Sequence, residues 1–332
     1  MDHLIKKTFK TKRGFTYTYY VSPAKDTKPT LFLQHGFPDS AAEWEDLINS
    51  HLKQAGYGVI AVDQLGYAGT SKPTDPVEYK MSGIVSDFID ILDSEGLDKV
   101  ISLGHDWGSR SAQMLYNLHP ERVAGLVLVN TGYVGINHQP FDLDGMIAMT
   151  EKVLGNGIGW YWKLFTADDG PRLLTENADL VFDALHSPDT WLEIFCTDGG
   201  IRKLIERRGE GFHLERRPYA TEEKKKAFVE RMSQDGFEGP TCWYKSFVLG
   251  LQDSEGRPEN NVCNVPTLYV GYEGDIVARK DFILPSVQAG FLPHLTNITL
   301  DGAHWGLLDD PNMFGQTITG WLAKEYSRPE TV

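Results

Sequence analysis

The chain has 332 residues, of which 41% are hydrophobic and 23% are charged, a balance typical of globular enzymes. Its formal net charge of −14 at pH 7 argues against a nucleic-acid backbone or an anionic membrane as a partner. The three scattered cysteines favour free thiols over a disulfide framework, and no Cys/His cluster suggests a metal site. Because the N-terminus has no signal-peptide pattern and no stretch is apolar enough to span a membrane, we expect a cytoplasmic protein.

Predicted strands and helices alternate through the first 130 residues and again after residue 250. In chain order we expect a hairpin over 8–21, a strand over 30–34, a helix over 41–54, a strand over 57–62, a helix over 82–94, a strand over 99–103, a helix over 108–119, a strand over 123–129, strands over 266–270 and 297–300, and a closing helix over 311–324. This alternation predicts an α/β fold with a mostly parallel sheet flanked by helices. Active sites in such sheets lie at the carboxyl ends of the strands.

The alternation of strands and helices is interrupted between Gly132 and about Gly250, where the chain is rich in tryptophan, tyrosine and charged residues. Helices are predicted there near 142–154, 171–185 and 221–234. We interpret this segment as a helical cap inserted between two halves of one α/β core. The predicted divisions are core residues 1–132, cap residues 133–250 and core residues 251–332.

The most informative motif is Gly104-His105-Asp106-Trp107-Gly108, which links an apolar strand to a predicted helix. This is the layout of a nucleophile elbow, a tight strand-to-helix turn that exposes one side chain above the sheet. The exposed residue is Asp106, so the motif predicts nucleophilic attack by a carboxylate. A turn aspartate that caps the next helix is the alternative for this motif taken alone. His105 is expected to pack or hydrogen-bond locally.

With these elements in place, the sequence resembles the α/β-hydrolase superfamily and, within it, the soluble epoxide hydrolase family. The elbow resembles the family's nucleophile motif, and His35-Gly36-Phe37-Pro38 resembles its oxyanion-hole loop. The resemblance implies backbone N–H groups of Phe37 and Trp107 as the oxyanion hole. Phe37–Pro38 is a candidate for a cis peptide bond.

The resemblance also implies the other catalytic residues. Asp275 follows the strand at 266–270 and His304 follows the strand at 297–300, the family's positions for the acid and the base. Tyr244 matches the family's Gly-Phe-x-Gly-Pro-x-x-Trp-Tyr segment closely, and Tyr161 matches the first lid tyrosine more loosely. Tyr219 and Tyr133 remain substitutes for that first tyrosine.

The implied function is the opening of an epoxide to a vicinal diol. Asp106 would form an alkyl-enzyme ester, two lid phenols would donate to the epoxide oxygen, and His304 would activate the water that cleaves the ester. The partner is a small apolar epoxide, and the substrate pocket is expected to include His35, Pro38, Trp162 and Trp305. No cofactor and no metal ion are implied, and the protein is expected to be a monomer or a homodimer.

Other readings of the same triad remain open. Dehalogenases share parts of these motifs, and Arg110, four residues after Asp106, matches one arginine of the haloacid enzymes. We expect its guanidinium to point away from the pocket. A third interpretation is that the protein is a ligand receptor with this fold and has no catalytic activity. Ring opening by a hydroxyl group of the substrate itself is a further variant of the first.

Overall fold

A central sheet organises the computed structural model, which describes Met1 and residues 3–326. Within that part of the chain, eight strands pair in the order β1-β2-β4-β3-β5-β6-β7-β8. Their bounds are β1 (Ile5–Lys10), β2 (Thr16–Ser22), β3 (Thr30–Gln34), β4 (Gly58–Val62), β5 (Val100–His105), β6 (Val123–Val129), β7 (Thr267–Tyr272) and β8 (Leu295–Leu300). The β1–β2 and β2–β4 pairs are antiparallel and the others are parallel, which confirms the predicted hairpin and mostly parallel sheet.

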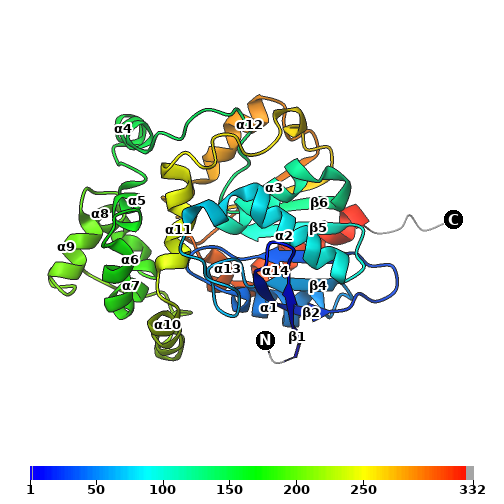
Figure 1. Cartoon of the computed structure of the whole chain (residues 1–332), viewed down its shortest axis with the longest axis horizontal. Coiled ribbons are helices and arrows are strands. Elements are labelled where there is room, and N and C mark those ends of the chain that lie inside the picture. The colour runs from blue at the N-terminus through cyan, green and yellow to red at the C-terminus, as the bar shows by residue number, and fades with distance from the viewer. Residues whose placement is uncertain (2, 327–332) are drawn as a thin grey trace.

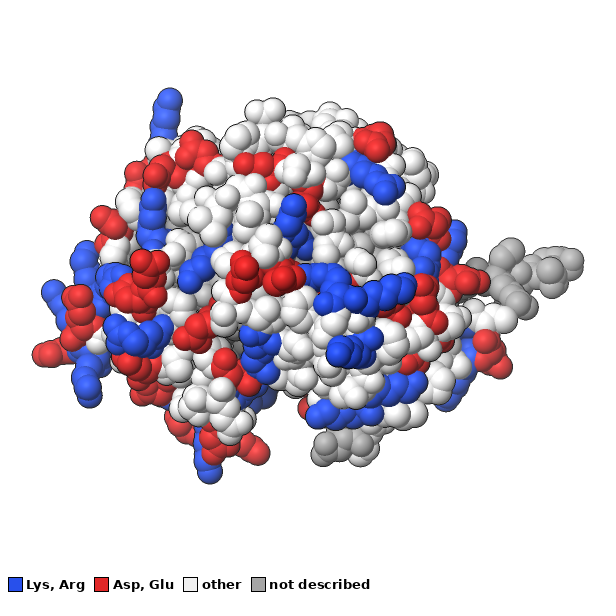
Figure 2. Space-filling view, viewed as in Figure 1, with Lys and Arg blue, Asp and Glu red and all other residues white. Residues whose placement is uncertain are grey.

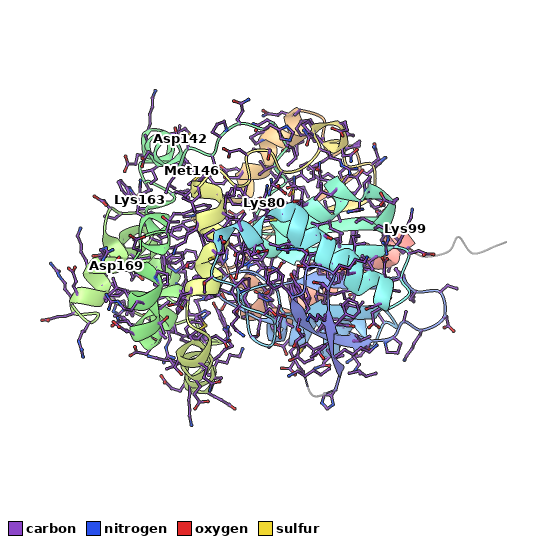
Figure 3. The ribbon with its side chains drawn as sticks, in the orientation of Figure 1. Lys80, Lys99, Asp142, Met146, Lys163 and Asp169 are labelled. Atoms are coloured by element: carbon purple, nitrogen blue, oxygen red, sulfur yellow. The ribbon has the colours of Figure 1, made fainter. Side chains whose placement is uncertain are left out.

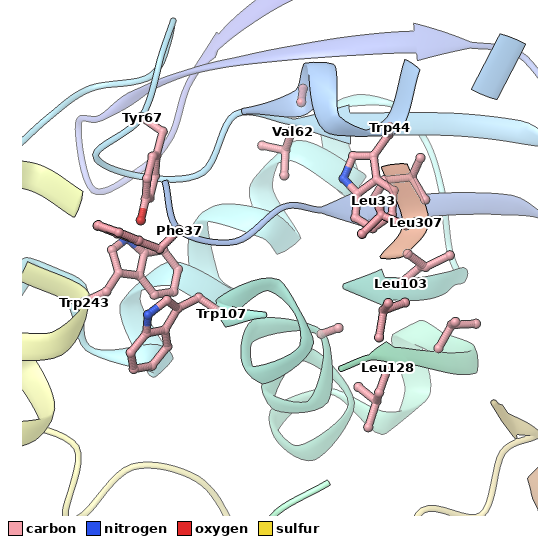
Figure 4. Packing of buried hydrophobic residues seen from close by; sticks show 14 of the residues in the cluster. Leu33, Phe37, Trp44, Val62, Tyr67, Leu103, Trp107, Leu128, Trp243 and Leu307 are labelled. Atoms are coloured by element: carbon pink, nitrogen blue, oxygen red, sulfur yellow. The ribbon is translucent and has the colours of Figure 1, made fainter. Parts of the chain in front are cut away.

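The middle strands are buried along their whole length, as apolar, β-branched runs in a parallel sheet require. Figure 4 shows how side chains from four adjacent strands meet two residues from outside the sheet: Leu33, Val62, Leu103, Leu128, Trp44 and Leu307. The same figure shows Phe37 and Trp107 from the core beside Trp243 of the inserted segment. One hydrophobic core therefore continues from the sheet to the inserted helices.

Helices of the core lie before and after the inserted segment. They are α1 (Glu45–Leu47), α2 (Met81–Ser94), α3 (Trp107–Leu118), α12 (Leu284–Gln288), α13 (Gly306–Asp309) and α14 (Pro311–Tyr326). Helix α2 packs against α3, and α14 packs against α1. The helices predicted over 82–94, 108–119 and 311–324 are confirmed within two residues at each end.

The single helix predicted over 41–54 is wrong in detail. The segment consists of a 3-10 turn (Ala41–Trp44), one α turn (α1) and a π turn (Ile48–Leu52). Residues three apart share a face in a 3-10 turn, so Ala41 and Trp44 both face the core and are fully buried.

The inserted segment between β6 and β7 consists of α-helices joined by loops and short 3-10 turns, and its described residues include no strand. They are α4 (Leu143–Leu154), α5 (Trp160–Phe165), α6 (Gly170–Glu176), α7 (Ala178–Leu185), α8 (Trp191–Ile194), α9 (Gly200–Glu206), α10 (Glu222–Asp235) and α11 (Glu238–Val248). Figure 1 shows α4 to α10 as a separate layer at the left, with α11 between them and the sheet. We call residues 143–248 the cap. The predicted helix over 171–185 is present as two helices, α6 and α7, on either side of Asn177.

The first cap helix, α4, is attached through both apolar and polar contacts: its Leu143 and Ile147 are buried and lie beside Gly159, just before α5. Figure 3 shows Asp142, which caps the start of α4, and Met146 of α4 above Lys163 of α5. Lys163 forms an ion pair with Asp144, and the indole N–H of Trp160 donates to Glu151 over 2.9 Å. Exposed ion pairs of this kind contribute up to about 1 kcal/mol each. These polar contacts therefore add little to the apolar packing of α4.

The surface carries both signs of charge, and Figure 2 shows Lys and Arg interspersed with Asp and Glu over the cap and the core. Among the described residues, no helix combines the length and the apolar character needed to cross a bilayer. Cys196, Cys242 and Cys263 are free, as predicted, and all three are buried. Residues 327–332, which end the predicted second half of the core, lie outside the described residues.

Among the described glycines, Gly108 leaves the least room for an added Cβ atom, and this predicts the first mutational effect. A Cβ atom at Gly108 would lie 1.8 Å from the carbonyl oxygen of Gln34, so α3 and β3 must separate in Gly108→Ala. We expect unfolding to require about 3 kcal/mol less free energy, measured by urea denaturation. Gly320→Ala is the matched control, because a Cβ at this position of α14 meets open space. This substitution is expected to raise the free energy of unfolding by about 0.5–1 kcal/mol. Equal effects of the two substitutions would contradict this packing argument.

Candidate active site

Asp106 occupies the tight turn between β5 and α3. Its backbone has φ 54° and ψ −121°, a conformation that non-glycine residues rarely adopt. The turn is tight because the flanking glycines touch neighbouring backbone: a Cβ at Gly104 would lie 1.9 Å from the carbonyl oxygen of Gly108. This geometry lifts the Asp106 carboxylate above the carboxyl edge of the sheet, as the elbow motif predicts.

The end of β3 supplies a hydrogen-bond donor to that carboxylate. The backbone N–H of Phe37 donates to Oδ1 of Asp106 over 2.9 Å. Gly36 permits this contact, because a Cβ there would lie 2.4 Å from Cβ of Asp106. The Phe37–Pro38 peptide bond is cis. Trp107 is the first residue of α3, where backbone N–H groups lack partners within the helix, and its place in an oxyanion hole stays a prediction.

His304 lies between two carboxylates that come from different strands. Its Nδ1–H donates to Oδ2 of Asp275 over 2.7 Å, and its Nε2 lies 3.7 Å from Oδ2 of Asp106. Asp275, which follows β7, also accepts bonds from the backbone N–H groups of Val277 and Ala278. These bonds orient the acid, and the acid orients the imidazole toward Asp106.

The charges of the triad shift its pKa values in opposite directions. Burial lowers the pKa of His304, but the charges of Asp275 and Asp106 and the hydrogen bond to Asp275 outweigh it and raise the pKa to about 9. Burial raises the pKa of Asp275, but the charge of His304 and the hydrogen bonds to the carboxylate leave that pKa below its usual value. In the free protein the triad is therefore an imidazolium between two carboxylates.

Two cap tyrosines face Asp106 in one cavity of about 40 Å³, room for a few water molecules. The rings of Tyr161 and Tyr244 are 5.9 Å apart and lie edge to face. Burial and the negative charge of Asp106 raise both phenol pKa values well above the usual range, so both groups stay protonated. The full lining is Phe37, Asp106, Tyr161, Phe165, Leu185, Trp191, Phe195, Tyr244, Val277, His304 and Trp305.

The alternatives to Tyr161 lie elsewhere in the fold. Tyr219 shares a hydrogen bond with Nδ1 of His186 and lines a different cavity. The Tyr133 hydroxyl donates to the carbonyl of Asn261. Tyr161 is thus the cap tyrosine that accompanies Tyr244 in the cavity.

Of the four residues predicted for the pocket, Trp305 lines the cavity. His35, Pro38 and Trp162 are outside its lining. His35 is fully buried and accepts the backbone N–H of Gln64 at Nε2, because the end of β3 turns its ring into the core. Pro38 lines the separate cavity that Tyr219 also lines. Trp162 packs against Tyr244, and their ring centroids are 4.8 Å apart.

Arg110, the feature shared with haloacid enzymes, is also outside the lining of the cavity. Its guanidinium donates to the carbonyl oxygen of Val134, which agrees with the prediction that it points away. Within Met1 and residues 3–326, no three His, Cys, Asp or Glu side chains gather so as to hold a metal ion.

Two polar residues near the triad were missed from the sequence. The amide of Asn130, just after β6, donates to Oδ2 of Asp275 over 2.6 Å. Glu43, in the turn before α1, lies 2.6 Å from Nδ1 of His105. A polar residue directly after a buried strand was an available signal for Asn130. Glu43 offered none, because a glutamate in a helical segment is ordinarily a surface residue.

The position of His304 between two acids predicts a pH dependence. Titration of its imidazole by NMR is expected to give a pKa near 9, and Asp106→Asn is expected to lower it by removing a negative charge. Because the folded pKa exceeds the unfolded one, the ion pairs stabilise the fold fully below about pH 6.5, and this stability is lost as pH rises through about 9. Asp90→Asn, on the distant α2, is the control. An unchanged pKa in Asp106→Asn would contradict this arrangement.

Comparison with known proteins agrees with the geometry. A family model described as the alpha/beta hydrolase fold matches residues 29–311. Epoxide hydrolase B of Mycobacterium tuberculosis is 35% identical, over 91% of this chain and 93% of that protein. Bifunctional epoxide hydrolase 2 of Sus scrofa is 28% identical over 91% of this chain, and the chain spans about half (52%) of that relative's length.

A solved structure of an epoxide hydrolase variant from Vigna radiata has the same fold. The two share a TM-score of 0.81 and 22% sequence identity, with 98% of this chain and 100% of that chain covered. Residues 29–311, which the family model matches, include the strands that precede the elbow, the acid and the histidine. The chain therefore belongs to the α/β hydrolase fold family and, within it, to the epoxide hydrolases.

Proposed function

We propose that the protein hydrolyses small apolar epoxides to vicinal diols through an ester of Asp106. The observation that carries this proposal is the shared cavity: a carboxylate nucleophile faces two protonated phenols there, with the imidazolium beside it. The names of the relatives support the same reaction class. The apolar walls, formed by residues such as Phe165, Leu185 and Phe195, favour a hydrocarbon substituent on the ring.

In the first step, Oδ2 of Asp106 attacks a ring carbon and the carbon–oxygen bond of the epoxide breaks. Tyr161 and Tyr244 donate hydrogen bonds to the epoxide oxygen, and one phenol transfers its proton to that oxygen. The oxygen becomes a hydroxyl group on the alkyl chain, and a phenolate remains in the cap. A phenol suits this role because it stays protonated beside a carboxylate and still donates a strong hydrogen bond to developing negative charge. The product of this step is an alkyl ester of the enzyme.

In the second step, water cleaves the ester at the Asp106 carbonyl carbon. Ester formation removes the negative charge of Asp106, which is one of the groups that raise the pKa of His304. The pKa of the imidazole therefore falls, and its Nε2 proton returns to the phenolate through solvent. The neutral imidazole then takes a proton from water as the water attacks, and gives it to the diol oxygen as the ester bond breaks. The Phe37 N–H, already bonded to Oδ1 of Asp106, is placed to stabilise the oxyanion.

Removal of the base is expected to separate the two steps. His304→Gln leaves Asp106 and both phenols in place, so the variant is expected to open the epoxide but not to clear the ester. Intact-mass spectrometry would then detect about one equivalent of alkylated protein. An adduct that fails to accumulate, although substrate is shown to bind, would count against His304 as the base.

The phenols distinguish an epoxide hydrolase from a dehalogenase with the same triad. An alkoxide that forms in the ring-opening step needs a strong hydrogen-bond donor, so Tyr244→Phe is expected to slow alkylation. The Tyr161→Phe/Tyr244→Phe double variant is expected to slow it more, with a barrier to alkylation about 2–4 kcal/mol higher. Arg110→Ala is the control, expected to leave alkylation unchanged. Halide release from haloacetates that tolerates both tyrosine changes and is abolished by Arg110→Ala would identify a dehalogenase instead.

A further inference from the structure

His304 is supported on the side opposite Asp275 by a second, fully buried pair. Oε1 of Glu43 lies 2.6 Å from Nδ1 of His105, and Nε2 of His105 lies 3.0 Å from the carbonyl oxygen of His304. Both side chains of the pair have 0% exposure. A chain of hydrogen bonds thus runs from Glu43 through His105 to the main chain of the base.

The acceptor at the end of this series of hydrogen bonds fixes the position of one proton. A carbonyl oxygen only accepts, so Nε2 of His105 must carry the hydrogen of that bond. Nδ1 of a neutral His105 is then an acceptor, and the 2.6 Å contact requires Glu43 to supply the hydrogen as a carboxylic acid.

The surroundings favour this neutral pair. Burial and the negative charge of Asp106 raise the pKa of Glu43 well above its usual value. Burial lowers the pKa of His105 to about 4, with the charge of His304 acting in the same direction. Asp39 and Asp106 are the other acids that face this pair. Asp39 contacts the Glu43 carboxyl group and accepts a bond from the indole N–H of Trp305.

Without a donor at position 43, His105 is free to take its other tautomer. In that tautomer the Nε2 lone pair faces the carbonyl oxygen of His304, and the attraction becomes repulsion. Alkylation depends on Asp106 and the phenols and does not need this support. Ester hydrolysis needs Nε2 of His304 to hold a water against the ester carbonyl, and a displacement of about 1 Å can slow such a step about 100-fold.

We propose that Glu43 is a positioning residue for ester hydrolysis: as a neutral hydrogen-bond donor it sets the tautomer of His105, which in turn anchors the main chain of His304. This inference rests on the proposed epoxide hydrolysis. It assigns to Glu43 a donor function, not a charge.

The test compares Glu43→Gln with Glu43→Met, which are similar in length but differ in having a donor. In the Met variant, ester hydrolysis is expected to slow about 10- to 100-fold, with alkylation within about threefold of the unmodified rate. The ester then accumulates, and kcat and KM fall together. In the Gln variant, the amide donates to Nδ1 of His105 and hydrolysis is expected to recover to within about fivefold. Single-turnover rates and intact mass measure both half-reactions.

Controls separate positioning from general loss of stability. Asp87→Ala removes another fully buried acid, bonded to Arg13 and Tyr17 away from the site, and is expected to lower the Tm without changing the ratio of the two half-reactions. Glu43→Ala is a second donor-free variant, in case Glu43→Met does not fold.

Two results would overturn the proposal. The first is a Gln variant as impaired as the donor-free variants, which would make charge the relevant property. The second is a donor-free variant that hydrolyses the ester at the normal rate or slows both half-reactions equally. Failure of the unmodified protein to form any ester would instead refute the proposed function itself.

Discussion

The contact between the end of β3 and the elbow after β5 determines the geometry of the whole site. Gly108 lies against the Gln34 carbonyl and Gly36 lies against the Asp106 side chain, so neither position has room for a Cβ. Because the two segments touch, the Phe37 N–H reaches Oδ1 of Asp106. The nucleophile is therefore held by backbone atoms, which have fewer alternative conformations than side chains.

Burial acts on the ionisable groups around this contact in different ways. It keeps the phenols of Tyr161 and Tyr244 protonated beside a carboxylate, and it keeps His105 neutral. His304 is equally buried, yet two carboxylates hold it as a cation. One low-dielectric environment thus supplies neutral donors and a charged base within a few ångströms, because the neighbours of each group differ.

Much of the fold was predictable, because glycine spacing and apolar strands are local signals. The elbow follows from glycines next to a strand end, whereas Asp275, His304, Tyr161 and Tyr244 depended on family resemblance. The 3-10 and π turns over 41–52 and the role of Glu43 were not predictable. Both depend on which side chains the tertiary fold places around them, and for Glu43 the decisive neighbour is 62 positions away in the chain.

The insertion of the cap between β6 and β7 has a consequence for biogenesis. Asp106 emerges early during synthesis, but β7 and β8, which carry Asp275 and position His304, follow the whole helical insertion. Pairing of β6 with β7 must close a loop of more than 130 residues, and such long-range parallel pairing is slow. On the ribosome, the nascent first half exposes the apolar edge of β6 until the second half arrives. Chaperone dependence is thus expected to concentrate in this interval.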